Sequence, residues 1–155
     1  MSVAARLTEL GIELPPVAAP VAAYVPALRV GDLVHTSGQL PFAGGRLVAS
    51  GRVGAEVTEE EAGAAARTAT LNALAALAAV AAVAGGLDAV ARVVRVVVYV
   101  ASTPEFHGQP AVANGASHLL GEVFGDAGAH VRSAVGVASL PLGAPVEVEL
   151  VVSLR

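Results

Sequence analysis

The sequence predicts a single α+β domain with the element order ββαβαββ. Three patterns carry this prediction: a strong helix start at residues 58–61, a nearly unbroken valine run at residues 93–100, and two segments of alternating apolar and polar residues near the carboxyl end. The chain has 155 residues, no internal repeat and no linker long enough to divide two domains. One hydrophobic core is therefore expected.

Residues 1–20 are expected to form an N-terminal extension, either structured or loose, in front of a domain that spans residues 21–155. The extension lacks the continuous apolar core of a secretory signal. Prolines near its end make a stiff lead-in to the domain.

The domain is predicted to open with two strands within Tyr24 to Leu40, joined near Gly31-Asp32. A second extended region is expected from Arg46 to Val57, where it continues the sheet or caps its edge.

A long helix is predicted to begin at Thr58 and to run to about Ala84. The Thr58 hydroxyl can accept a hydrogen bond from the backbone N–H of Glu61 while the Glu61 side chain reaches back, and neighbouring acids complement the helix dipole. Gly85-Gly86 supplies the left-handed conformation that ends many helices.

The segment Val93 to Val100 is predicted to be a central strand, because its near-continuous valines indicate burial on both faces. Helices can cover one face, but the rest of the chain has little material to cover the other. A neighbouring subunit is the economical cover, and the hydrophobic content of 55% agrees with a partner.

A second helix with one apolar face is predicted from Pro110 to Phe124. Two alternating strands follow, Val131 to Ser139 and Pro145 to Leu154, joined through residues 140–143.

The composition excludes several classes of chemistry. No Cys is present, so thiolate nucleophiles, disulfides and Cys-ligated zinc are impossible, and a cytoplasmic location is expected. All nine basic residues are Arg, which excludes an internal Schiff base. A net charge of -4 without a basic cluster argues against a nucleic acid partner. The longest apolar run, residues 71–84, is too short to span a membrane.

No motif indicates a metal or a cofactor. The four histidines are scattered without metal-ligand spacing, and the glycine motifs of nucleotide-binding proteins and serine hydrolases are missing. What remains is the C-terminal pair of strands, where Arg132 begins one strand while Glu147 and Glu149 share a face of the next. Arg132 either forms an ordinary interface salt bridge with one of these acids or belongs to a ligand site.

Several of these segments carry a family resemblance. Ser37-Gly38-Gln39-Leu40-Pro41, Arg132-Ser133, Leu140-Pro141 and Glu147-Val148-Glu149 occur in the order and at the spacing of the RidA/YjgF family of enamine/imine deaminases. The chain resembles this family over most of its length.

The resemblance implies a chorismate-mutase-like fold with helices packed on one face of a mixed sheet, in a homotrimer whose three ligand clefts lie at subunit boundaries. It implies hydrolytic deamination of small 2-aminoacrylate-like enamines and imines to 2-keto acids and ammonia, without a cofactor. A neighbouring subunit would then cover the valine-rich strand.

The resemblance also implies roles for individual residues. Arg132 grips the substrate carboxylate, Glu147 positions the attacking water, and further residues bind substrate or line the cleft: Tyr24, Ser37, Gly38, Asn114 and Ala134. Tyr24 could equally be a packing aromatic, and Ser37 a turn residue whose hydroxyl caps nearby backbone.

The sequence departs from the family pattern at the rim of the expected cleft. Ala22-Ala23 stand where many members have Gly-Pro, Ala134 stands where Cys is frequent, and His130 stands where Pro is common. Two alternatives to a deaminase are open: a non-catalytic trimer that binds keto acids, and the ribonuclease activity with which some relatives are labelled, which the acidic composition disfavours.

Overall fold

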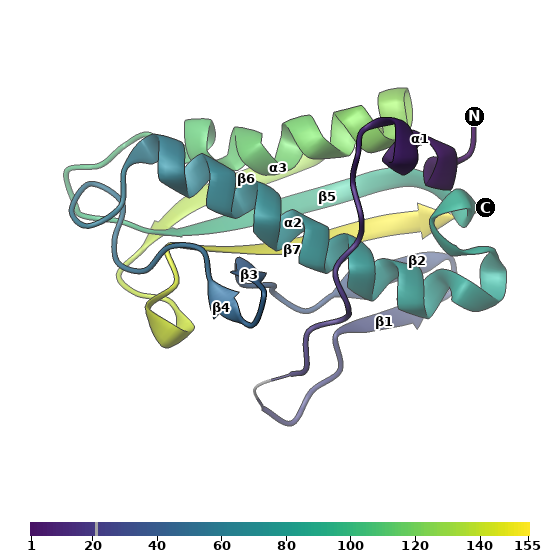
Figure 1. Ribbon diagram of the computed structural model, residues 1–155, viewed down its shortest axis with the longest axis horizontal. Helices are drawn as coiled ribbons and strands as arrows, with labels where there is room; N and C mark the ends of the chain where they lie inside the picture. The colour runs from purple at the N-terminus through teal and green to yellow at the C-terminus, as the bar shows by residue number, and fades with distance from the viewer. Residues whose placement is uncertain (21) are drawn as a thin grey trace.

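The computed structural model describes residues 1–20 and 22–155. Two long helices lie together on one face of a five-stranded sheet, and the two ends of the chain lie near one another (Figure 1). The strands follow the order β1 (Ala27–Val30), β2 (Leu33–Thr36), β7 (Val146–Leu154), β5 (Val90–Ala101) and β6 (Val131–Val137). All neighbours are antiparallel except β5 and β6, which are parallel. The sheet is therefore mixed, as expected.

The first long helix, α2 (Glu59–Ala81), begins at the predicted capping box. The Thr58 hydroxyl accepts from the Glu61 N–H at 3.1 Å, and the Glu61 carboxylate accepts from the Thr58 N–H at 2.8 Å. A short 3-10 turn (Ala82–Ala84) extends the helix to Gly85, whose φ of 108° ends it. By length and composition α2 could cross a membrane, but 61% of its most apolar window is buried within the protein, so α2 is a core helix.

The second long helix, α3 (Gln109–Phe124), crosses α2 at close range. A Cβ atom on Gly115 would collide with the backbone carbonyl of Gly63, so the absence of a side chain at this point lets the two helices approach. A 3-10 turn (Gly125–Gly128) then leads into β6.

The N-terminal extension is structured. Helix α1 (Val3–Glu9) buries Leu7, and Arg6 of this helix donates from Nε to the Glu122 carbonyl of α3 at 2.8 Å. The Asp88 carboxylate accepts from the Val3 N–H at 2.5 Å. These contacts hold α1 against the ends of α3 and β5.

The expectation for residues 46–57 needs a correction. Strands β3 (Phe42–Ala43) and β4 (Arg46–Leu47) form a separate two-stranded sheet and do not extend the main one. Glycines at 44 and 45 both have positive φ, which favours this tight hairpin. Further along, the Val53 N–H donates to the Ala101 carbonyl at 2.8 Å, which ties the segment to the end of β5.

The two faces of the main sheet differ. Val96, Val98 and Val100 of β5 are completely buried beneath the helices. On the opposite face, apolar side chains remain exposed on both outer strands, with Leu28 and Val30 of β1 at 57% and 60% exposure and Val131 of β6 at 61%. Within the described part of the chain, no helix covers this open face (Figure 1).

Candidate functional site

Arg132 lies on the face of the sheet that carries the helices. It is paired in register with Val96, whose side chain is buried on that face. Its guanidinium contacts α3: Nη1 donates to Asn114 Oδ1 at 2.9 Å and to Ser117 Oγ at 3.0 Å, and Nη2 donates to the Pro110 carbonyl at 3.4 Å. Asn114 and Ser117 are three residues apart, so they share one side of the helix.

All of these partners are neutral. The ion pairs among residues 1–20 and 22–155 join Arg6 to Glu9, Arg29 to Asp32 and Arg67 to Glu122. Arg132 belongs to none of them, so among the described residues of one chain it has no acidic partner. A guanidinium held in place by neutral groups keeps its positive charge available for a carboxylate.

An open depression of about 450 Å³ lies beside Arg132. Ser117 and His130 line it together with Asp126, Ala129 and three glycines. The glycines and the single alanine leave room for a small molecule next to the guanidinium.

Glu147 lies on the opposite face of the sheet. It is paired with Tyr99, whereas its neighbour Val148 is buried in the core beneath the helices. Burial raises the pKa of the Glu147 carboxyl, and the nearby carboxylate of Glu149 raises this pKa further. Glu149 itself accepts a hydrogen bond from the Tyr99 hydroxyl at 3.2 Å. A carboxyl with a raised pKa can exchange protons closer to neutral pH than an ordinary Glu.

Gly38 lies directly against the Glu147 carboxyl. A Cβ atom at position 38 would overlap the side chain of Glu147, and the φ of Gly38 lies outside the left-handed region. The requirement for glycine is therefore one of space and not of backbone conformation. The short Ser-Gly-Gln segment after β2 thus fixes where the carboxyl can lie.

Tyr24 and Gly38 line a small cleft together. Its walls also include Pro26, Phe42 and residues 18–20 of the extension, and Tyr24 is 44% exposed. The neighbouring Ser37 hydroxyl donates to the Val25 carbonyl at 2.5 Å, which is the backbone-capping geometry that the sequence offered as the alternative for this residue.

The predicted site residues thus fall into two groups within one chain. Arg132 and Asn114 meet on the helix face, and Ala134 shares that face two residues further along β6, half-buried against the core. The second group lies on or beside the other face of the sheet, near the Glu147 side chain of β7. It consists of Tyr24, Ser37, Gly38 and Glu147. Each group offers half of the chemistry, a cation or an acid, so a substrate that needs both requires two chains.

Sequence reasoning missed Ser117 as a partner of Arg132. A serine three residues after Asn114 on a predicted helix was the available signal. His130 was noticed only as a departure from the family pattern, yet its ring contacts Ser117, with Nε2 2.9 Å from Oγ.

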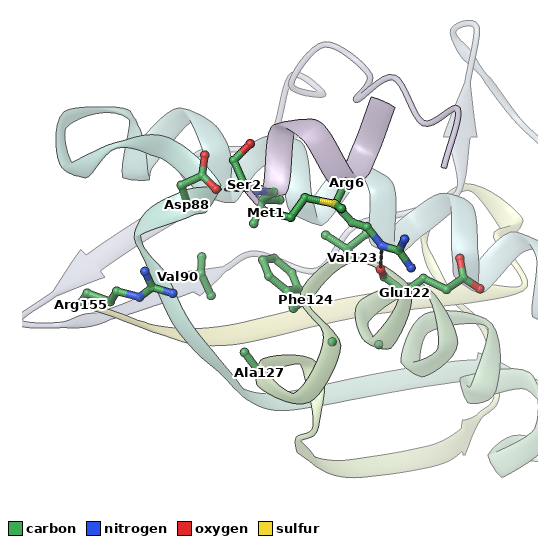
Figure 2. Close-up of a pocket in the computed structure, with 13 residues that line it drawn as sticks. Met1, Ser2, Arg6, Asp88, Val90, Glu122, Val123, Phe124, Ala127 and Arg155 are labelled. Atoms are coloured by element: carbon green, nitrogen blue, oxygen red, sulfur yellow. Dashed lines mark hydrogen bonds between the residues drawn. The ribbon is translucent and has the colours of Figure 1, made fainter. Parts of the chain in front are cut away.

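Another cavity, of about 580 Å³, lies between α1 and the end of α3 (Figure 2). Figure 2 shows Arg6 reaching Glu122 on one side of this cavity, with Arg155 on the other. Arg6 is already bound to the Glu122 carbonyl and to the Glu9 carboxylate at 2.6 Å. None of the predicted site residues lines this cavity. The hydrogen bonds of Arg6 hold α1 in place beside it.

The described residues contain no cluster of three His, Cys, Asp or Glu side chains that could hold a metal ion. The two groups of residues offer a guanidinium that can bind a carboxylate and a carboxyl group that can transfer a proton.

The sheet order and the two helices on one face define the YjgF/chorismate mutase-like α+β fold. The family profile described as "YjgF/chorismate_mutase-like, putative endoribonuclease" matches residues 4–154. The chain belongs to this family, also called RidA, whose proteins are generally homotrimeric.

Individual relatives agree with this assignment. The chain is similar to Protein TCP17 of Trypanosoma cruzi, with 48% identity over 99% of this chain and 94% of the relative. The crystal structure of Atu1372 from Agrobacterium tumefaciens, a protein of unknown function, is 41% identical with a TM-score of 0.87 and covers 98% of this chain and 91% of its own. A "putative endoribonuclease" from Shewanella oneidensis is 36% identical with a TM-score of 0.92, covering 99% and 100% of the two chains.

Proposed function

We propose that this protein hydrolyses small, carboxylate-bearing enamines and imines to 2-keto acids and ammonia, at clefts formed between the subunits of a homotrimer in the cytoplasm. The observation that carries the proposal is the state of Arg132, whose guanidinium is anchored by neutral groups and has no acidic partner within the described chain.

Arg132 supplies the binding step. A guanidinium can hold a carboxylate through two parallel charge-assisted hydrogen bonds, which fixes both the position and the orientation of a small substrate. Anchoring by Asn114 and Ser117 limits the motion of the side chain before substrate arrives. Less conformational freedom is then lost on binding.

Glu147 supplies the proton transfers. A 2-aminoacrylate-like enamine first becomes an imine when a proton moves from nitrogen to the terminal carbon. The Glu147 carboxylate then accepts a proton from water as the water oxygen bonds to the imine carbon, and it returns this proton to the nitrogen to give a carbinolamine. Glu147 next accepts the proton of the carbinolamine hydroxyl and delivers it to the amino nitrogen, so that the C–N bond breaks, the C=O bond forms and ammonia leaves. The raised pKa of Glu147 suits a group that both accepts and returns a proton.

A homotrimer accounts for two features of the isolated chain. The open face of the sheet carries exposed apolar residues on β1 and β6, which a neighbouring subunit would cover. The cation and the acid lie on opposite faces, so the cation of one subunit would meet the acid of the next at each boundary.

The endoribonuclease label of the family finds less support in this chain. The net charge is -4, and Arg132 is the only basic side chain, apart from His130, among the residues that line the depression beside it. An RNA backbone needs several cationic contacts along a groove.

The test is the release of ammonia and 2-keto acid from 2-iminobutyrate or 2-aminoacrylate generated by a coupled enzyme. Wild-type protein should accelerate release, and Arg132→Ala should lower kcat/KM by about a hundredfold, since two charge-assisted hydrogen bonds are lost. Arg46→Ala, which removes an exposed cation from the β3–β4 hairpin, is the matched control and should behave as wild type. Arg132-dependent binding of 2-ketobutyrate without turnover would favour the non-catalytic alternative.

A further inference from the structure

His130 and Ser117 form a hydrogen-bonded chain that ends on Arg132. His130 Nδ1 lies 2.5 Å from the Gly128 carbonyl oxygen, His130 Nε2 lies 2.9 Å from Ser117 Oγ, and Ser117 Oγ lies 3.0 Å from Arg132 Nη1. The three side chains come from α3, the turn before β6, and β6 itself.

With the His130 ring neutral, the direction of each hydrogen bond in this series follows from its donors and acceptors. A carbonyl oxygen only accepts, so Nδ1 of His130 carries the proton, and in the neutral ring Nε2 is then an acceptor. Ser117 therefore donates its hydroxyl proton to Nε2. A guanidinium only donates, so the Ser117 oxygen must use a lone pair to accept from Arg132. The Ser117 hydroxyl is left with one orientation.

The Gly128 carbonyl, which accepts the hydrogen bond from His130, is itself held in place. Gly128 is buried, and a Cβ atom there would collide with the Leu120 carbonyl of α3, so the turn lies tightly against the helix. The imidazole is thus anchored to the same helix that carries Ser117 and Asn114.

We infer that His130 is a positioning residue for the substrate carboxylate. Through its Nδ1–H tautomer it orients the Ser117 hydroxyl, and this hydroxyl holds the Arg132 guanidinium beside the depression. This inference rests on the proposed function, in which Arg132 binds the carboxylate. The effect of His130 on the carboxylate passes through Ser117 and Arg132.

The KM and kcat of a set of variants test the contacts that run from His130 through Ser117 to Arg132. His130→Phe and Ser117→Ala should each raise KM for 2-iminobutyrate about three- to tenfold, the worth of one hydrogen bond, with kcat changed less than about twofold. Because the two residues act in series, the double variant should be no worse than Ser117→Ala alone. Ser117→Thr keeps a hydroxyl and should restore a KM near that of wild type.

His118→Phe is the matched control, because His118 is an exposed histidine beside Ser117 on α3. It should leave KM unchanged. A wild-type KM in His130→Phe, or effects of His130→Phe and Ser117→Ala that multiply in the double variant, would overturn the inference.

A measurement without substrate separates this inference from the proposed function. Nitrogen-15 NMR should show His130 as the Nδ1–H tautomer, and the Arg132 Nη groups should rotate slowly in wild type and faster in Ser117→Ala and His130→Phe. An Nε2–H tautomer, or Arg132 rotation that neither variant changes, contradicts the inference. If wild type neither turns over 2-iminobutyrate nor binds 2-ketobutyrate, the proposed function fails while the NMR result still decides whether His130 positions Arg132.

Discussion

The Arg132 guanidinium and the Glu147 carboxylate lie on opposite faces of one sheet. Arg132 is in register with buried Val96 on β5, whereas Glu147 is in register with Tyr99, whose side chain points to the other face. Since β5 separates the two strands, one chain cannot bring this cation and this acid to the same small substrate. In the proposed homotrimer, a second copy covers the exposed apolar face and brings the two separated groups of residues together.

The pH dependence of activity should report the interaction between Glu147 and Glu149. Burial and the Glu149 charge raise the Glu147 pKa, so activity that needs the ionised carboxylate should fall, as the pH is lowered, at a higher pH than an ordinary Glu would give. Glu149→Gln removes the repulsion and keeps an acceptor for Tyr99, so the acid limb of kcat/KM should move to lower pH. Glu105→Gln, an exposed acid elsewhere, is the control. An acid limb that stays in place in Glu149→Gln would refute this link.

The same pKa shift predicts a stability effect. The folded-state pKa of Glu147 lies above its unfolded value, so the native protein binds this proton more tightly and the ionised carboxylate destabilises it. Glu147→Gln should therefore be more stable than wild type at about pH 8, and the difference should vanish as the pH falls to about 4, below the unfolded value. Urea unfolding at fixed protein concentration measures the free energy of unfolding of both proteins at each pH. Equal stabilities at the higher pH would argue against a buried charge.

Gly38→Ala should lower the activity of the site without unfolding the protein. Its Cβ atom would displace the Glu147 carboxyl, and a misplaced base costs about tenfold or more in kcat. Gly63→Ala, where a Cβ atom meets nothing within 4 Å, is the control and should retain full activity. Circular dichroism and the imine assay check both variants. Normal kcat in Gly38→Ala would show that the close contact has no catalytic importance.

Two glycines of α3 should respond oppositely to alanine. Gly115→Ala forces a methyl group against the Gly63 backbone and should lower the free energy of unfolding by about 1–3 kcal/mol. Gly121→Ala points into open space, where the better helix propensity should raise stability by about 0.5–1 kcal/mol. Thermal and urea unfolding measure both effects. Similar stabilities for the two variants would contradict the close crossing of α2 and α3.

Local chemistry made most elements predictable. The capping box at Thr58 and the left-handed Gly85 fixed both ends of α2, and the alternation in residues 146–154 identified β7. The extended region expected from Arg46 to Val57 did not reveal the hairpin of β3 and β4, because short extended segments do not encode their pairing partners. Strand β5 begins at Val90, three residues before the predicted valine run.

The site was predictable only residue by residue. The resemblance named Arg132 and Glu147, but alternation within each strand gives relative faces along that strand and not between strands. Their placement on opposite faces depends on the register of both strands with β5, which no local pattern contains. The contact between Ser117 and His130 likewise joins a helix to a turn and has no sequence period.

Mixing two inactive variants tests the shared site most directly. Homotrimers of Arg132→Ala and homotrimers of Glu147→Gln should each be inactive. The two variants are then co-expressed with different tags, and the trimers that carry both tags are purified. Each mixed trimer should regain about a third of wild-type activity, because one of its three boundaries pairs an intact Arg132 with an intact Glu147 of the adjacent copy. Mixed trimers with no more activity than the parent variants would contradict a site shared between subunits.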